Sequence, residues 1–411
     1  MAEQGAATTD TRVPGDGRLA HLREHGQGAG AVRPIELFFD LVYVLAVTQL
    51  TRHLLANLTL RGVLETLILL LAVWGAWNHI AWITNYFDLG DRAPRLVLIG
   101  LMFASLIMSS SLFGAFDGHG LAFGAALSAS LFGGQLAAVA AVGRRHRLTA
   151  VLERVLIWWI PVCLLLIAGG FVEGNARIAL WVIALAVLYI VTWTGFPLPG
   201  LGRSLTTDYT IAGEHMAERC YLFITIALGE SILVIGSQFG ELARAPSTVT
   251  AFAVAFVGSV AFWWIYFDRS AEDGIELMAT ATDPGRLGVT AYTYFHVPMV
   301  AGVIAAAGGY ELAIAHPGDE VDAAPACHIL GGPALFLVGH TLFKRSLWGF
   351  VPRARLAAIG ALVALIPVAI VSPTLVLLAL TSAVVVAAAW SSSRTQTSPV
   401  NGLGEDQLAG F

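Results

Sequence analysis

Hydrophobic residues occur in long runs that are separated by short polar stretches along most of the chain. A helix needs about 20 apolar residues to cross a bilayer, and only helices or closed barrels satisfy their backbone hydrogen bonds there. By this length rule the pattern predicts twelve membrane-spanning helices in an all-α polytopic membrane protein. They begin near Ile35, Val63, Leu96, Leu121, Leu152, Arg177, His215, Val249, Val289, Ala326, Leu356 and Thr374.

Composition supports this fold class. Hydrophobic residues make up 57% of the chain and charged residues 12%, whereas a soluble domain has about 25% charged residues. The lipid bilayer is therefore the expected partner. The net charge of −5 and the lack of a basic stripe argue against nucleic acid as a partner. The three cysteines form no CxxC pair, so the sequence predicts no disulfide framework, no metal site and no cofactor.

Basic residues indicate the orientation. If the N-terminus is cytoplasmic, seventeen Lys and Arg residues fall on the cytoplasmic side of the twelve spans and four, Arg52, Arg61, Arg177 and Arg244, on the other. Cytoplasmic loops carry such an excess, so we expect both termini in the cytoplasm and the protein in the cell (plasma) membrane. The polar stretches 1–32 and 391–411 are predicted to be disordered cytoplasmic tails.

Several stretches occur twice in the same order, which predicts an internal repeat. Tyr86 and Tyr266, each in a Tyr-Phe-Asp triplet, are 180 residues apart, and Glu36 and Glu218, each near the start of a span, are 182 apart. Two further matches, at Gly133 with Gly331 and Pro161 with Pro367, are 198 and 206 apart. We therefore expect two parallel six-helix halves, residues 33–195 and 215–390, joined by a cytoplasmic linker, residues 196–214.

The seventh predicted span contains four residues that could carry chemistry. His215, Glu218 and Arg219 open the span, and Glu230 is the deepest acid in the chain. At 100° per residue, Arg219 and Glu230 point the same way, and His215 is a neighbour of Arg219 on that face. Charged groups inside spans are expensive and face protein or water. The functional interpretation makes Glu230 a proton or cation site with Arg219 and Glu218 as a modulating pair; the alternative is a structural pair between helices.

The first predicted span opens with Glu36 and Asp40, which share one helix face. Two ionised acids at this spacing repel, so one of them could hold a proton. The alternative is that acids near a helix N-terminus complement the helix dipole, which applies to Glu36 more than to Asp40.

Two other spans add candidates. In the second, Asn78, Trp82 and Asn85 form a stripe that could line a polar cavity or hydrogen-bond between helices. In the ninth, His296 precedes Pro298 by two residues. A proline inside a span disrupts the helix, so His296 is either a proton carrier or a satisfied core histidine at a kink.

With these residues identified, the chain resembles the bacterial low temperature requirement A (LtrA) family of integral membrane proteins. The matching stretches are residues 33–50, 84–88, 215–230, 263–268, 296–302 and 331–337, of which the first and third are the most specific. The resemblance implies a multi-pass bacterial membrane protein and a name that records a cold-growth phenotype. It implies no reaction and no substrate.

The residues favour a secondary transporter or an ion or proton pathway that uses Glu36, Asp40 and Glu230. The transported molecule or ion is unknown, and homo-oligomerisation is left open. One alternative is a membrane-embedded enzyme or lipid-handling protein in which His215 or His296 acts as acid or base. No nucleophile motif supports it, so we favour a non-enzymatic protein. The other alternative is a sensor or structural protein that responds to the state of the membrane.

Overall fold

The structure is a computed structural model, and it describes residues 32–142, 147–209, 211–241, 245–268 and 270–395. Regular structure in these residues is helical apart from two isolated β-bridges. The first six helices are α1 (Pro34–Ala56), α2 (Leu60–Tyr86), α3 (Arg92–Ser111), α4 (Gly120–Val142), α5 (Arg147–Phe171) and α6 (Gly174–Thr194). After a short 3-10 helix, η2 (Thr206–Asp208), the longer elements are α7 (Gly213–Glu241), α8 (Pro246–Phe267), α11 (His296–Ala315), α12 (Ala323–Trp348) and α15 (Thr374–Thr395).

Shorter elements lie between these helices. They are α9 (Ser270–Thr280), α10 (Pro284–Leu287), the π-helix η3 (Gly288–Tyr294), α13 (Arg353–Ala364) and α14 (Ile366–Ala369).

Local sequence signals set several helix ends. At the start of α1, Pro34 occupies the first turn, and Glu36 accepts a hydrogen bond from the backbone N–H of Arg33 at 2.9 Å. The Thr59 side chain caps α2 by accepting from the N–H of Gly62. Gly349 ends α12 in the left-handed conformation, which glycine adopts without strain. Helices α1 and α2 therefore begin close to the predicted starts of their spans.

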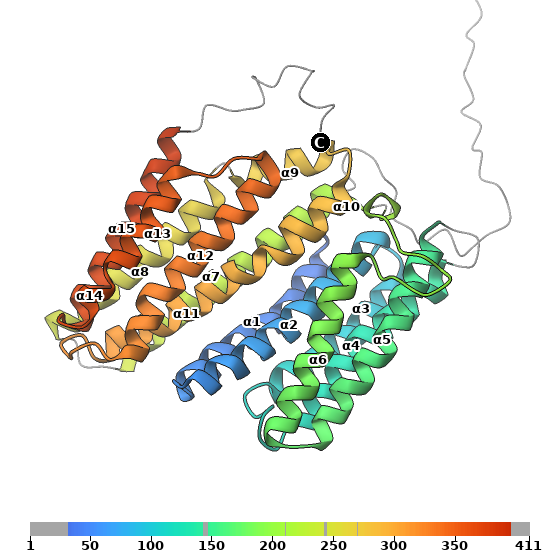
Figure 1. Cartoon of the computed structure of the whole chain (residues 1–411), viewed down its shortest axis with the longest axis horizontal. Helices are drawn as coiled ribbons and strands as arrows, with labels where there is room; N and C mark the ends of the chain where they lie inside the picture. Colours follow the sequence, from blue (N-terminus) through green and yellow to red (C-terminus); the bar gives the residue numbers. More distant parts are fainter. Residues whose placement is uncertain (1–31, 143–146, 210, 242–244, 269, 396–411) are drawn as a thin grey trace, which may run out of the picture.

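Helices α1 and α2 lie in the middle of the molecule (Figure 1). On one side, α1 packs against α3, and α2 packs against α4 and α6. On the other side, both helices pack against α7 and α11. The remaining long helices, α8, α12 and α15, pack around α7 and α11. Side chains at the contact between α1 and α7, such as Glu36 and Arg219, are therefore buried inside the bundle.

Eleven of the described helices are long and apolar enough to cross a membrane. The prediction of a continuous eleventh span near Leu356 is wrong, because that segment is divided at Leu365 into α13 and α14. The break precedes Pro367, which has no N–H to donate and disfavours helical geometry in the residue before it.

The two pieces α13 and α14 together still return the chain to the opposite end of the bundle. Glu320, in the α11–α12 loop, forms a β-bridge with Pro373, and the N–H of Thr374 donates to the carbonyl of Asp319 at 3.0 Å. The residues after α14 therefore lie beside the α11–α12 loop. The chain passes across the bundle twelve times, with the eleventh crossing built from two short helices.

The sequence-based prediction missed α9, whose eleven residues include Glu272 and Asp273 and are too few and too polar to resemble a span. This helix packs against α7 and α8, and the Tyr221 hydroxyl donates to the carbonyl of Ala271. The tail predicted over residues 1–32 lies outside the described residues except for Val32, and the one predicted over 391–411 is helical up to Thr395. Its remainder is outside the described residues.

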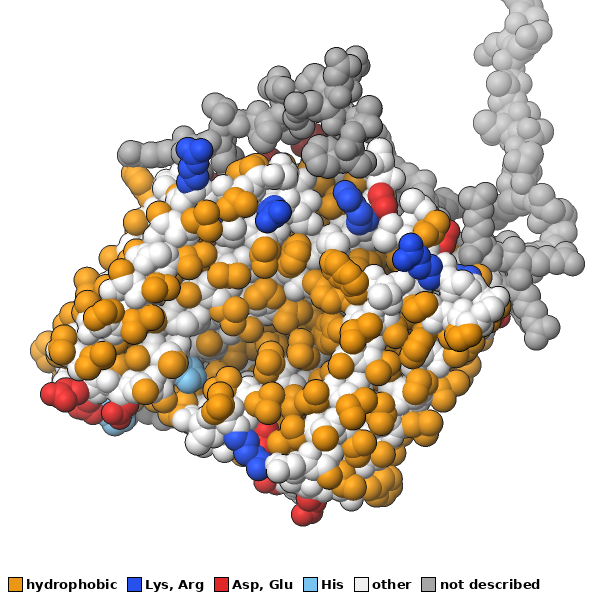
Figure 2. All heavy atoms as spheres, viewed as in Figure 1, with side chains coloured by type: hydrophobic (Ala, Val, Ile, Leu, Met, Phe, Trp, Pro, Cys, Tyr) orange, Lys and Arg blue, Asp and Glu red, His pale blue; other side chains and the backbone are white. Residues whose placement is uncertain are grey.

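Hydrophobic side chains cover a broad band across the middle of the face in Figure 2, and charged side chains are concentrated toward its two ends. On this face, most Lys and Arg side chains lie toward the end that carries α9 and α10 (Figures 1 and 2). A band of this kind is expected where lipid tails surround a protein, because charged groups are costly there. The helices and this surface are those of a multi-pass membrane protein.

Candidate functional site

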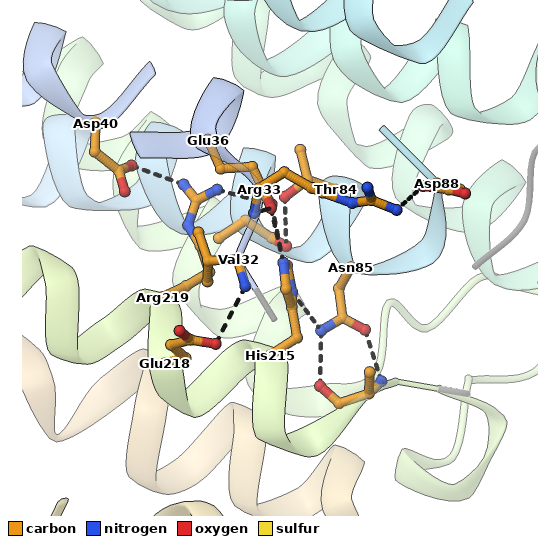
Figure 3. A network of polar contacts seen from close by, with 12 residues as sticks. Val32, Arg33, Glu36, Asp40, Thr84, Asn85, Asp88, His215, Glu218 and Arg219 are labelled. Atoms are coloured by element: carbon orange, nitrogen blue, oxygen red, sulfur yellow. Dashed lines mark hydrogen bonds and ion pairs between the residues drawn. The ribbon is translucent and has the colours of Figure 1, made fainter. Parts of the chain in front are cut away.

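The contact between α1 and α7 contains a buried cluster of charged side chains (Figure 3). Glu36 of α1 accepts hydrogen bonds from His215 and Arg219 of α7, at 2.9 Å in each case. All three side chains are fully buried. These residues are 179 and 183 positions apart, so the packing of the two helices alone brings them together. Because both helices start at this contact, α1 and α7 run parallel.

Asp40 lies one helical turn beyond Glu36 and shares the same arginine. The second terminal nitrogen of Arg219 donates to Asp40 Oδ1 at 2.7 Å, and the Trp77 indole N–H donates to the same oxygen at 2.8 Å. The guanidinium carbon of Arg219 also lies 5.6 Å from the centre of the Trp77 ring, within cation–π range. Asp40 Oδ2 and Arg219 Nε are buried and have no hydrogen-bond partner among the described residues.

Asn85, at the end of α2, fixes the protonation of His215. Its amide makes two hydrogen bonds with the backbone of Ala212: Oδ1 accepts the N–H at 2.8 Å, and Nδ2 donates to the carbonyl at 2.9 Å. This pairing determines which end of the amide is Nδ2, and Nδ2 lies 3.1 Å from His215 Nδ1. His215 Nδ1 must therefore accept, so the ring proton is on Nε2, where it is donated to Glu36.

Glu218 has a different role from the one predicted. The prediction paired it with Arg219, but Arg219 pairs with Glu36 and Asp40, while Glu218 Oε2 accepts from the backbone N–H of Val32 at 3.2 Å. The prediction failed because adjacent residues on a helix point in different directions. Of these two residues, Arg219 faces the acids of α1 and Glu218 does not.

Glu230 forms a second polar contact between the same two helices. Thr48 of α1 donates to Glu230 Oε2 at 2.6 Å, and the Glu230 side chain is buried. Arg219 and Glu230 therefore both face α1, as their spacing predicted. Eight residues separate Asp40 from Thr48, a rise of about 12 Å along α1. The buried side chains between the two contacts include Val47 and Phe223, which are apolar, and Tyr43, whose hydroxyl lies 3.1 Å from that of Ser105.

The predicted stripe on α2 contacts the π-helix η3 through Thr293. The indole N–H of Trp74 donates to the Thr293 carbonyl at 2.7 Å, and that of Trp82 donates to its hydroxyl at 3.2 Å. The Thr293 hydroxyl lies 3.1 Å from Asn78 Oδ1. The stripe thus makes hydrogen bonds between helices, one of the two predicted alternatives. Two of its members, Asn78 and Trp82, also line a cavity.

His296 lies at an irregular position in the backbone, as Pro298 predicted. The π-helix ends at Tyr294, and α11 begins at His296. Its Nδ1 lies 2.9 Å from the Ala291 carbonyl and its Nε2 lies 2.7 Å from the Tyr266 hydroxyl. These contacts satisfy both ring nitrogens and match the core-histidine alternative. A proton-carrying role for His296 stays a prediction.

Two residues of this network were not among the sequence candidates. Trp77 looked like an ordinary apolar residue of a span, and nothing in the sequence marks it as a donor to Asp40. Thr293 is one of many hydroxyl residues in spans, and its importance depends on the π-helix that turns it toward α2. In the described part of the chain, no group of three or more His, Cys, Asp or Glu side chains could hold a metal ion.

The family model for the bacterial low temperature requirement A protein matches residues 31–390. The chain belongs to the bacterial low temperature requirement A family. A relative, Uncharacterized protein RA0937 of Rhizobium meliloti (strain 1021), is 34% identical over 330 residues, which cover 80% of this chain and 81% of the relative. No solved structure matches the chain. The LtrA match includes every residue of the buried cluster and extends from before α1 into α15.

Proposed function

We propose that this LtrA protein is a proton-linked secondary transporter in which the α1–α7 contact carries the proton. The observation behind the proposal is the unpartnered Asp40 Oδ2, a buried carboxylate oxygen next to an arginine that two acids share. A group that takes up and releases a proton needs such an oxygen. The transported solute is not specified by this site.

Charge balance supports Asp40 as the proton carrier. Asn85 holds His215 in its neutral form, so the charges in the cluster come from Glu36, Asp40 and Arg219. With both acids ionised the cluster has a net charge of −1, and with one added proton it is neutral. An uncompensated charge in a buried site is costly. One proton on Asp40, whose Oδ2 is free to carry it, balances the cluster.

Glu230 supplies the second proton station. Glu230 lies on α7 and faces α1, whereas Asp40 lies on α1 and faces α7, and side chains such as Val47 and Phe223 lie between the two acids. Among the described residues, no chain of hydrogen bonds joins the two acids. Transfer therefore requires α1 and α7 to shift relative to each other, as alternating-access carriers do when one bundle rocks against another.

The helix packing supports two parallel six-helix repeats. In the first half α1 packs on α3, α3 on α4, α4 on α5, and α5 on α6; in the second half α7 packs on α11, α11 on α12, α12 on α13, and α13 on α15. The pair α2 and α6 likewise corresponds to α8 and α15. In this correspondence α1 and α7 are equivalent helices, and α9 is an insertion. Sites between repeats are common in transporters.

The test is proton flux into proteoliposomes under an imposed pH gradient, followed with an internal pH-sensitive dye. Wild-type protein should give flux above protein-free liposomes, and Asp40→Asn and Glu230→Gln should each lower it at least tenfold. Asp319→Asn and Glu320→Gln make the same chemical changes at exposed acids of the α11–α12 loop and should leave flux unchanged.

Full flux in both Asp40→Asn and Glu230→Gln would overturn the proposed route. A monodisperse wild-type sample without flux would overturn transport itself and favour a sensor or an enzyme. The His215–Glu36 distance of 2.9 Å satisfies the acid–base geometry that the enzyme alternative requires, but both side chains are fully buried.

A further inference from the structure

A cavity lies beside the charged cluster, on the other side of α2. Its lining comes from α2, α4, α5, α6, the π-helix η3 and the segment between α6 and α7, and its empty volume, which includes space open to the surroundings, is about 700 Å³. The π-helix itself is one indication of a site, because single π-helical turns occur frequently at functional sites.

One polar group in this cavity lacks a partner. Asn78 is 5% exposed, and its Nδ2 has no hydrogen-bond partner among the described residues. At the other end of the amide, Oδ1 lies 3.1 Å from the Thr293 hydroxyl, which also lies 2.9 Å from the Gly288 carbonyl. A buried donor without a partner costs about 1–3 kcal/mol. A bound molecule with an acceptor atom would remove this cost.

The rest of the lining restricts the chemistry of that molecule. Trp74, Trp82, Tyr86, Trp159, Tyr189 and Tyr209 contribute aromatic side chains. None of the described lining residues is Asp, Glu, Lys or Arg. An ionised ligand would lose its hydration without gaining a counter-charge. An organic cation would be attracted by the rings but repelled by the amide N–H donor of Asn78.

We propose that the cavity binds a neutral ring compound that carries a carbonyl or hydroxyl oxygen, with the rings against the aromatic side chains and the oxygen accepting from Asn78 Nδ2. Aromatic pairs contribute about 0.5–1.5 kcal/mol beyond the area they bury. The oxygen orients the molecule, because Asn78 is the cavity's unpartnered donor among the described residues. This site does not depend on the proposed proton pathway, since no member of the charged cluster lines it.

Three two-ring compounds of similar size test whether the cavity prefers a neutral ligand with an acceptor oxygen over an apolar ligand or a cation. The ketone 1-tetralone has the acceptor, tetralin has the same ring skeleton without it, and N-methylquinolinium is a cation. Binding is measured by equilibrium dialysis against the protein in nanodiscs, with empty nanodiscs subtracted for partition into lipid. We expect saturable binding of 1-tetralone, at least threefold weaker binding of tetralin, and no saturable binding of N-methylquinolinium.

Three variants test whether the probes bind in the cavity beside Asn78. Asn78→Leu removes the donor at nearly constant size and should weaken 1-tetralone about three- to tenfold, as expected for one neutral hydrogen bond, without affecting tetralin. Asn175→Leu makes the same change at the exposed start of α6 and should bind like wild type. Val155→Trp, which fills the cavity, should abolish binding of both neutral probes.

Several results would overturn the proposal: no saturable 1-tetralone binding to monodisperse protein, equal affinity for 1-tetralone and tetralin, or unchanged affinity in Asn78→Leu. If Val155→Trp is not monodisperse, the Asn78→Leu comparison still decides the outcome. Wild-type protein that binds 1-tetralone but gives no proton flux would contradict the transport proposal alone. Wild-type protein that gives flux but does not bind 1-tetralone would contradict this proposal alone.

Discussion

The backbone of one residue, Ala212, sets the net charge of the buried cluster at the α1–α7 contact. It does so through Asn85, which contacts His215. By pairing with both ends of the Asn85 amide, it orients Nδ2 toward His215 Nδ1 and so keeps the ring proton on Nε2. The neutral histidine then leaves Arg219 as the sole cation facing Glu36 and Asp40 among the described residues. The chemical state of each group in the site is thus set by its neighbours and not by its residue type.

Arg219 should therefore be far more important for stability than Asp40. We expect Arg219→Gln to lower stability by about 3–5 kcal/mol, because it leaves two buried acids without a positive partner. Asp40→Asn retains the Glu36–Arg219 pair and should cost less than about 1.5 kcal/mol, roughly the value of one hydrogen bond. The stabilities of the two variants are compared by thermal unfolding in detergent, followed by the circular dichroism signal of the helices. Equal destabilisation by the two substitutions would contradict the assigned charges.

At the scale of whole helices, close packing depends on glycines that face a neighbouring backbone. Helices α11 and α12 approach so closely that a Cβ on Gly302 would lie 2.5 Å from the Phe336 nitrogen, and one on Gly332 would lie 2.5 Å from the Ala306 nitrogen. Small residues allow this approach between membrane helices.

Gly332 and its neighbour Gly331 form a matched test of this packing. A Cβ at Gly332 would meet the backbone of α11, whereas a Cβ at Gly331 would have no atom within 4 Å. We expect Gly332→Ala to destabilise the protein by about 1–3 kcal/mol through overpacking. Gly331→Ala should be neutral or stabilise by up to about 1 kcal/mol, because alanine favours the helix. The melting temperatures of the two variants measure the difference. A Gly332→Ala variant as stable as wild type would contradict the close approach of α11 and α12.

At the scale of the whole molecule, the chain crosses the bundle an even number of times, so we predict that the start of α1 and the end of α15 lie on the same side of the membrane. The bonds that join the start of α15 to the α11–α12 loop require α13 and α14 to cross, even though neither could span a bilayer alone. The excess of basic residues on that side predicts that it faces the cytoplasm.

Cysteine labelling tests this topology. In a Cys327→Ser background, which removes the exposed native thiol, Gly318→Cys in the α11–α12 loop should react with a membrane-impermeant maleimide in intact cells. Arg203→Cys, between α6 and α7, should react only after the cells are permeabilised. Both positions are exposed, so access through the membrane is the difference measured. Labelling of Arg203→Cys in intact cells would contradict a cytoplasmic linker.

The sequence by itself determined the membrane class, the positions of the crossings and most of the candidate site residues. It could do so because lipid leaves the backbone few alternatives to a helix and makes each buried charge expensive. The break before Pro367 and the short polar helix α9 were missed because each departs from the length and composition of a span.

Only the tertiary structure decided which residues meet. Glu36 and Arg219 are 183 positions apart, and helix periodicity gives the face of each helix but not the neighbour that the face contacts. The same limit hid Trp77 as the donor to Asp40, and it hid the cavity beside Asn78, which exists because the π-helix turns Thr293 toward α2. Such contacts depend on how separate helices pack, a property of the whole bundle that no local pattern contains.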